Sequence, residues 1–226
     1  MEVPSREDAV DAPPLPTLDA AEEELLRSGQ TLRWQEPPGV GGVGSGFAAL
    51  ELCADANEVW EAVSGFSRYA ELIPTVRTAA AYDGPTGATE PSNVCRYSFL
   101  VSRIRLRLDV RFAVDPALQY ASWRLDRPSW VLQDSTGYWR VEPCTDRPGI
   151  VRVWFAVSVR LSKRVPGFVV SLVSRLGLSK ATKWLRQLDK SVEFGECALP
   201  DDDDAPSPLL TPAELAELER SMRDSS

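Results

Sequence analysis

Cysteine and histidine supply many of the nucleophiles, general bases and metal ligands of proteins. This chain of 226 residues has no histidine and only four cysteines, none of which is spaced as in a CxxC motif. That composition excludes Ser-His-Asp and Cys-His catalysis, and it indicates neither a zinc site nor a disulfide framework. We therefore expect no metal, no cofactor and no catalytic residue, and we expect the cysteines to be small buried residues in a reducing compartment. They are Cys53, Cys95, Cys144 and Cys197.

Other motifs for chemistry are also scarce. The glycines within residues 39–46 match neither GxGxxG after a strand nor GxxxxGK, so this stretch reads as a linker and not as a phosphate-binding loop. Four arginines at alternating positions resemble a stripe for nucleic acid or anionic lipid: Arg103, Arg105, Arg107 and Arg111. A single-strand binder also needs aromatic side chains on the same face. None alternate with these arginines on that face, so we predict no nucleic-acid partner.

The net charge of -8 is unevenly distributed and divides the chain into three parts. Residues 1–45 carry -6 and residues 195–226 carry -7, which leaves +5 for residues 46–194. We expect an acidic, Pro- and Gly-rich, mostly disordered tail over residues 1–45, apart from a short helix over Ala20 to Arg27. A folded domain over residues 46–194 follows. A second acidic tail over residues 195–226 ends in a short helix over Thr211 to Arg223.

No apolar run reaches about eighteen residues, so we predict no membrane span. An evident targeting signal is also missing, which favours a cytoplasmic location and leaves a plastid or membrane-peripheral role open.

Alternation of apolar and polar residues predicts a series of strands that must position any site. Phe47 to Ala54 is the first. Asp55 with Glu58 then predicts a capping box at the start of two short helices that end before Pro74. Six further strands follow without an intervening helix, which implies an antiparallel meander. They span residues 76–82, 92–101, 104–114, 119–125, 133–142 and 150–161.

A long helix is expected from Pro166 to Phe194, apolar along one side and basic along the other. Eight Lys or Arg and one Asp lie between Arg160 and Val192. This basic side either contacts an anionic membrane or is an ordinary solvated helix surface. About seven strands with helices available for one face predict an α+β domain of two layers.

Six short segments of the sequence carry a resemblance to a known family: Asn57 to Val63, Phe66, Tyr69, Ile73 to Val76, Gly137 to Pro143 and Val165 to Phe168. They resemble the START-like superfamily (SRPBCC, Bet v 1-like), which includes polyketide cyclase/dehydrase proteins, and its coenzyme Q-binding branch is the most similar. The resemblance covers residues 46–194. It implies a helix-grip fold, in which a curved antiparallel sheet holds the long C-terminal helix and leaves an apolar cavity between them.

We therefore expect a non-catalytic protein that binds or transports an apolar small molecule such as a lipid, quinone or isoprenoid. Alternate residues of a strand face the same side of the sheet, and this identifies the side chains that would face such a cavity. Each of them is also of a type that commonly fills a protein core. The predicted wall is Tyr97, Phe99, Leu108, Val110, Phe112, Trp123, Trp139, Val153, Phe155 and Val157, and the predicted lid is Phe168, Leu172 and Leu176.

Two alternatives stay open. The first is an aromatase/cyclase-like enzyme for a polyketide-type substrate, in which Tyr97, Tyr120 or Arg124 polarises a carbonyl group. The second is a scaffold whose acidic tails recruit partner proteins.

Overall fold

The computed structural model describes residues 12–36, 43–84, 91–101, 106–163, 165, 178 and 181–190. One antiparallel sheet of eight strands occupies most of this part, in the order β1-β2-β8-β7-β6-β5-β4-β3. The strands are β1 (Leu32–Glu36), β2 (Val43–Cys53), β3 (Val76–Ala81), β4 (Val94–Val101), β5 (Leu106–Asp115), β6 (Tyr120–Arg127), β7 (Leu132–Pro143) and β8 (Ile150–Leu161).

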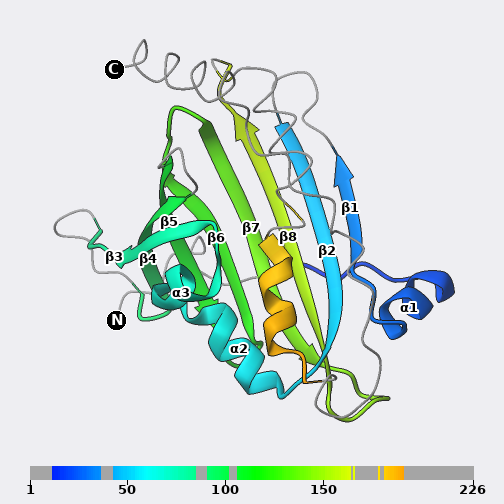
Figure 1. Ribbon diagram of the computed structural model, residues 1–226. Coiled ribbons are helices and arrows are strands. Elements are labelled where there is room, and N and C mark those ends of the chain that lie inside the picture. The colour runs from blue at the N-terminus through cyan, green and yellow to red at the C-terminus, as the bar shows by residue number, and fades with distance from the viewer. Residues whose placement is uncertain are drawn as a thin grey trace, which may run out of the picture.

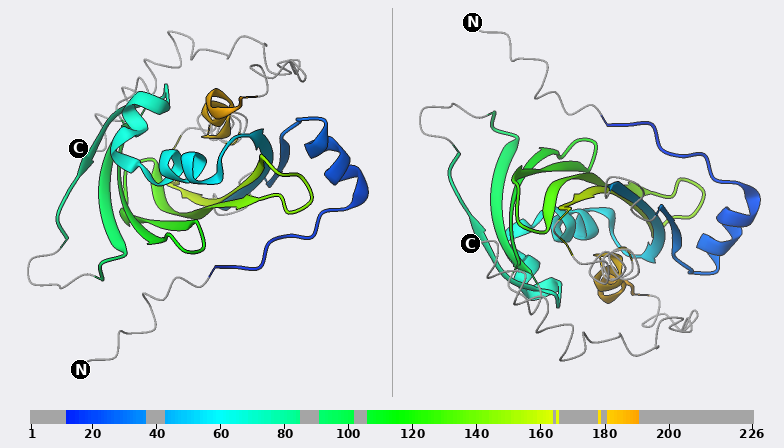
Figure 2. Two further views of the ribbon diagram at one scale, coloured as in Figure 1. Left: turned by 90° about the horizontal axis from the view of Figure 1, so that it is seen from below. Right: turned by 90° about the horizontal axis from the view of Figure 1, so that it is seen from above.

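The sheet curls around the helices that follow its second strand (Figures 1 and 2). These are α2 (Ala56–Ser64), η2 (Phe66–Arg68) and α3 (Tyr69–Leu72), and η3 (Trp184–Leu188) lies on the same concave face. We call this the inner face of the sheet and the opposite one the outer face. The predicted α+β class is confirmed, and α2, η2, α3 and η3 all lie on the inner face of the antiparallel sheet. A further helix, α1 (Ala20–Arg27), packs on the outer face, where Leu26 meets Ala49 and Trp154.

Capping starts α2 as the sequence predicts. Asp55 is the N-cap, and its carboxylate accepts from the backbone N–H of Asn57 at 2.8 Å and of Glu58 at 3.2 Å. Such a cap stabilises a helix by about 1 kcal/mol. The side chain of Glu58 accepts instead from Lys190 Nζ at 2.5 Å, which ties the helix to the C-terminal end of the domain.

An eighth strand and a first helix precede the predicted domain. The helix α1 (Ala20–Arg27) has the expected bounds, and Asp19 and Glu22 form a capping box at its start. Strand β1 pairs with β2 from Leu32–Ala49 to Glu36–Ser45. The start predicted at residue 46 falls inside β2, because this strand pairs with β8 from Val43 onward.

The C-terminal helix ends earlier than the sequence predicts. Residues 181–183 are α-helical, η3 continues to Leu188, and Asp189 is already extended. The predicted end at Phe194 is wrong because the chain leaves the helix to pair with the end of β2. Lys190 N–H donates to the Cys53 carbonyl at 2.8 Å, and the Asp189 carboxylate accepts from Cys53 N–H at 3.3 Å. Within the described ranges, no helix is long and apolar enough to cross a membrane.

Candidate functional site

All ten predicted wall residues lie on the inner face and join one apolar cluster, which we call the inner cluster. Six of them are buried, and the other four are partly buried against them. Their role as a ligand-binding wall stays a prediction. The buried six are Phe99, Val110, Phe112, Trp139, Val153 and Phe155, and the half-buried four are Tyr97, Leu108, Trp123 and Val157.

Register explains why these side chains meet. Phe112 of β5 pairs with Trp123 of β6, and Trp139 of β7 pairs with Phe155 of β8. Because directly paired residues point to the same face, the alternation of each strand continues across the sheet. The helices add residues that the parity of the strands could not reveal: Trp60, Val63, Phe66, Tyr69, Trp184 and Leu185.

Aromatic rings make up much of this cluster. Phe66 stacks on Phe112 with ring centroids 3.8 Å apart, and Trp139 lies 4.3 Å from Phe155. Trp184 of η3 meets Trp139 edge to face at 6.3 Å. Each favourable aromatic pair is worth about 1 kcal/mol beyond its buried area. The inner cluster therefore offers flat, polarisable surfaces to whatever lies on it.

The inner face is not equally buried along the length of the strands. Under α2 and η3 it is complete, since Val141, Val151 and Val153 are at most 2% exposed. Further along the strands the inner face stays half-exposed at Tyr97, Trp123 and Val157. Beyond this stretch a second buried cluster forms from Val131, Leu132, Leu161 and Val165, and Leu108 contacts both clusters. The half-exposed apolar stretch thus lies between two packed ends.

Buried polar groups of the inner cluster are used locally. The Tyr69 hydroxyl donates to the Val63 carbonyl at 2.5 Å, and burial raises the pKa of this phenol far above its ordinary value. Thr182 Oγ1 donates to the Leu178 carbonyl, and Trp184 Nε1 donates to the Ala181 carbonyl. Tyr69 thus bonds the backbone of α2, while Thr182 and Trp184 bond backbone carbonyls within their own segment of the chain, so these groups present little polarity to the half-exposed stretch.

The three residues considered for carbonyl polarisation do not meet. Tyr97 lies on the inner face, 5.6 Å from the ring of Phe66. Tyr120 is buried on the outer face, where its ring contacts Tyr138 at 5.6 Å. Arg124 is exposed on that face as well, since its neighbour Trp123 points inward. The interpretation of Tyr120 and Arg124 as cavity residues is therefore wrong, because both have the opposite parity on β6.

The predicted lid residues Phe168, Leu172 and Leu176 lie outside the described residues, as does the expected helix over residues 211–223. The structure does describe the end of the C-terminal helix, which hydrogen bonds hold to β2 and to the turn before β1. Arg186 donates to the Glu51 carbonyl at 3.1 Å and to the Gly29 carbonyl at 2.6 Å. Arg186 and Lys190, predicted on the basic side, thus make internal contacts.

A charged network under α1 was not predicted. Glu51, with 4% of its side chain exposed, accepts from Arg147 at 2.5 Å and from Arg152 at 2.7 Å. Arg152 also donates two bonds to Glu23 of α1, at 2.9 and 2.7 Å. Burial raises the pKa of the Cys144 thiol to about 11, so it stays protonated and donates to Glu51 at 3.6 Å. The only sequence signal was Glu51, an acid inside an apolar strand.

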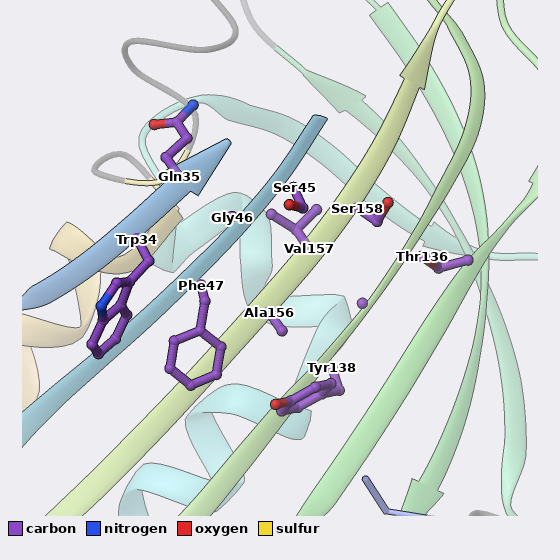
Figure 3. A pocket seen from close by; sticks show the side chains of 11 residues that line it. Trp34, Gln35, Ser45, Gly46, Phe47, Thr136, Tyr138, Ala156, Val157 and Ser158 are labelled. Atoms are coloured by element: carbon purple, nitrogen blue, oxygen red, sulfur yellow. The ribbon is translucent and has the colours of Figure 1, made fainter. Parts of the chain in front are cut away.

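A hollow of about 700 Å³, lined entirely by described residues, opens on the outer face (Figure 3). We call it the outer hollow. It is not the predicted cavity, because its aromatic walls point away from the inner cluster. A second hollow of about 520 Å³ lies where β2 meets α2. The lining of the outer hollow is Trp34, Gln35, Ser45, Gly46, Phe47, Thr136, Gly137, Tyr138, Ala156, Val157 and Ser158.

Comparisons with known proteins find similarity in structure and none in sequence. No family model matches the chain, and no curated protein matches it. A START superfamily protein from Mycobacterium smegmatis superposes with a TM-score of 0.51 at 17% identity, over 66% of this chain and 98% of that one.

Two further solved structures have the same score. An aromatase/cyclase from Streptomyces sp. R1128 matches at TM-score 0.51 and 12% identity, over 74% of this chain and all of the other. A STAR-related lipid transfer protein from Xanthomonas axonopodis matches at 0.51 and 12%, over 70% of this chain and 92% of the other fragment. At these identities the likeness shows a shared fold and no more.

Proposed function

We propose that this chain, which has the START-like fold, binds a ring-containing apolar small molecule on its inner face and carries or senses it without changing it. The ligand would lie on the half-exposed stretch between the two packed clusters, in contact with Tyr97, Leu108, Trp123 and Val157. Quinones and isoprenoid-linked rings fit this surface best. The coenzyme Q-binding branch that the sequence resembles belongs to this proposal, as does a cytoplasmic location.

One observation supports the proposal above others. Large apolar side chains normally face the interior because each square ångström kept from water contributes about 25 cal/mol. Here Trp123 and Val157 face the helix side of the sheet and are still only half-buried. An apolar ligand that covered them would add the missing burial.

The energetics are sufficient for binding. Each buried CH₂ group contributes about 0.8 kcal/mol, so ten carbons contribute roughly 8 kcal/mol before association costs of several kcal/mol. Flat rings gain further from stacking on Trp123 or Tyr97. No reactive group is required, and none of the buried polar groups described above is directed at the half-exposed stretch.

The test begins with native mass spectrometry of the full chain as purified, which should detect a bound apolar compound. Thermal unfolding with added ubiquinone and, separately, with phosphatidylcholine then ranks the two ligand types. We expect ubiquinone to raise the midpoint by several degrees.

Leu108→Trp should abolish this shift, because the larger ring fills the half-exposed stretch. The matched control Leu118→Trp adds the same ring at a position that is 50% exposed, and it should leave the shift unchanged. A chain that carries no extractable compound, and that gains no stability from either ligand, refutes the proposal.

Membrane delivery is tested separately. If the basic side of the C-terminal helix contacts anionic lipid, the loaded protein should co-sediment with phosphatidylserine vesicles at low salt and be released at high salt. The absence of sedimentation at low salt leaves a carrier that does not dock on such membranes.

A further inference from the structure

Two cross-strand rows build the outer hollow, and the first is aromatic. Phe47 of β2 and Tyr138 of β7 both pair with Ala156 of β8. Neighbouring strands lie about 4.8 Å apart, so the two ring-bearing residues are about 10 Å apart at their Cα atoms. Only the methyl group of Ala156 stands between them, as Figure 3 shows. A space wide enough for a flat ring is therefore open over Ala156.

Neighbouring aromatic residues brace both walls. Phe47 contacts Trp34 with centroids 5.1 Å apart and Trp154 at 5.7 Å, while Tyr138 contacts Tyr120 at 5.6 Å. Trp154 and Tyr120 are buried, and Trp34 is 36% exposed at the edge of the sheet. A wall held by buried neighbours loses little side-chain entropy when a ligand binds to it.

The second row is polar. Ser158 of β8 pairs with Ser45 of β2 on one side and with Thr136 of β7 on the other. It lies two residues beyond Ala156, so its side chain is on the same face. Three hydroxyl groups thus line one edge of the hollow, each able to donate and to accept. Gln35 borders the hollow as well, but it pairs with Gly46 and so its side chain has the parity of the inner face.

The lining carries no charge, because none of its eleven residues is Asp, Glu, Lys or Arg. A purely apolar ligand would cover the hydroxyl row and offer it no hydrogen-bonding group. An ionic ligand would lose its own hydration without meeting an opposite charge in the lining itself. The lining instead suits a neutral molecule with apolar ring faces and hydroxyl groups around its edge.

We propose that the outer hollow is a second ligand site, specific for a neutral sugar. The C–H face of the sugar ring packs against Phe47 or Tyr138, and its hydroxyl groups exchange hydrogen bonds with Ser45, Thr136 and Ser158. Its volume of about 700 Å³ lies within the range usual for small-molecule sites. The site is distinct from the one proposed on the inner face, since the paired aromatic rows point to opposite sides of the sheet.

The experiment titrates the isotope-labelled full chain with glucose, galactose, mannose, maltose, cellobiose and lactose, and follows backbone amide signals by NMR. At least one sugar should cause saturable shifts that are largest at the residues lining the outer hollow and absent from α2, η2, α3 and η3. Because the hollow is open, we expect a dissociation constant on the order of 1 mM.

Two substitutions, combined in one variant, remove hydroxyl groups with little change of shape. Thr136→Val combined with Ser158→Ala should weaken binding about tenfold while leaving the thermal midpoint nearly unchanged. The control Arg124→Ser alters an exposed residue of the same face that does not line the hollow, and it should bind like the parent chain.

Three results overturn the proposal. These are no saturable shift with any of the six sugars, shifts that are largest at the inner-face helices α2, η2, α3 or η3, or equal affinity of the hydroxyl-deleted variant. Neither quinone binding nor its absence affects the outcome, because the hydroxyl groups removed from Thr136 and Ser158 lie on the face opposite the inner cluster.

Discussion

The indole of Trp123 lies against Gly137 on the neighbouring strand, so close that a Cβ at position 137 would stand 2.2 Å from the indole Cζ2. This approach places the ring across β7, where it stacks on Phe155 at 5.5 Å. Trp123 therefore covers the surface of the sheet instead of projecting from it. The glycine thus allows the indole to lie flat against the inner face.

Gly137→Ala should destabilise the chain and reduce binding of the apolar ligand. Its Cβ would also stand 2.2 Å from the Ala156 carbonyl oxygen, so both the indole and the backbone must move, at a cost of about 1–3 kcal/mol. Urea unfolding measures the first effect and the ubiquinone-induced thermal shift measures the second.

Gly149→Ala is the contrasting control for Gly137. Its φ is 83° but nothing lies within 4 Å of the new Cβ, so it should lose stability through backbone strain alone and keep ligand binding. If Trp123→Leu fails to relieve any part of the cost of Gly137→Ala in a double-mutant cycle, the indole is not the group that is displaced.

Acid should weaken the fold through Glu51. Burial by itself raises the pKa of this carboxyl group, but the hydrogen bonds and charges of Arg147 and Arg152 outweigh it and hold the pKa below the ordinary value of 4.5. A group whose pKa is lower in the folded state contributes stability above its unfolded pKa and loses it as the pH falls through the folded pKa. The free energy of unfolding should therefore decline below pH 4.5.

Glu51→Gln isolates this contribution to the pH dependence. The variant should be less stable at neutral pH, because Arg147 loses its closest carboxylate partner, and its stability should fall less steeply in acid. Denaturant unfolding between neutral and acidic pH compares the slopes. Burial also raises the pKa of the Asp109 carboxyl group, but Arg107 and other partners lower it more. Asp109 should therefore leave some loss of stability in acid in both chains. If the unfolding free energy of both chains falls equally steeply with pH, Glu51 does not cause the loss of stability in acid.

The strands were predictable because one face of an antiparallel sheet is buried and the other is solvated, so apolar and polar residues alternate along each strand. Strand β1 was missed because its five residues lie in an acidic stretch rich in Pro and Gly, and Trp34 is partly exposed at the sheet edge. The parity that selected the ten wall residues could not reveal Phe66, Tyr69 or Trp184. Their positions depend on how helices pack across the sheet, and tertiary contacts decide that packing.

Arg186 should connect the C-terminal helix to the start of the chain. Its guanidinium donates to the Gly29 carbonyl and the Thr31 hydroxyl just before β1, and to the Glu51 carbonyl of β2. Arg186→Ala should destabilise the chain by about 2 kcal/mol, because bonds from a charged donor are lost. Arg68→Ala, with 58% of its side chain exposed and Glu71 at 3.7 Å, should change stability by less than about 0.5 kcal/mol. Equal effects of the two variants in urea unfolding would contradict the connection.

Tyr97 distinguishes a carrier from a cyclase. Of the three residues first considered for polarising a carbonyl, only this one lies on the inner face, where its ring contacts Phe66 and Phe99. Tyr97→Phe keeps the ring and removes the hydroxyl, so a carrier should bind ubiquinone with unchanged affinity, and a polyketide mimic should stay unreacted in both chains. Trp123→Ala is the positive control, since loss of a half-buried indole at the same surface should weaken quinone binding about tenfold. Conversion of the polyketide mimic by the parent chain, lost in Tyr97→Phe while binding persists, would replace the carrier with an enzyme that uses this hydroxyl to polarise the substrate carbonyl.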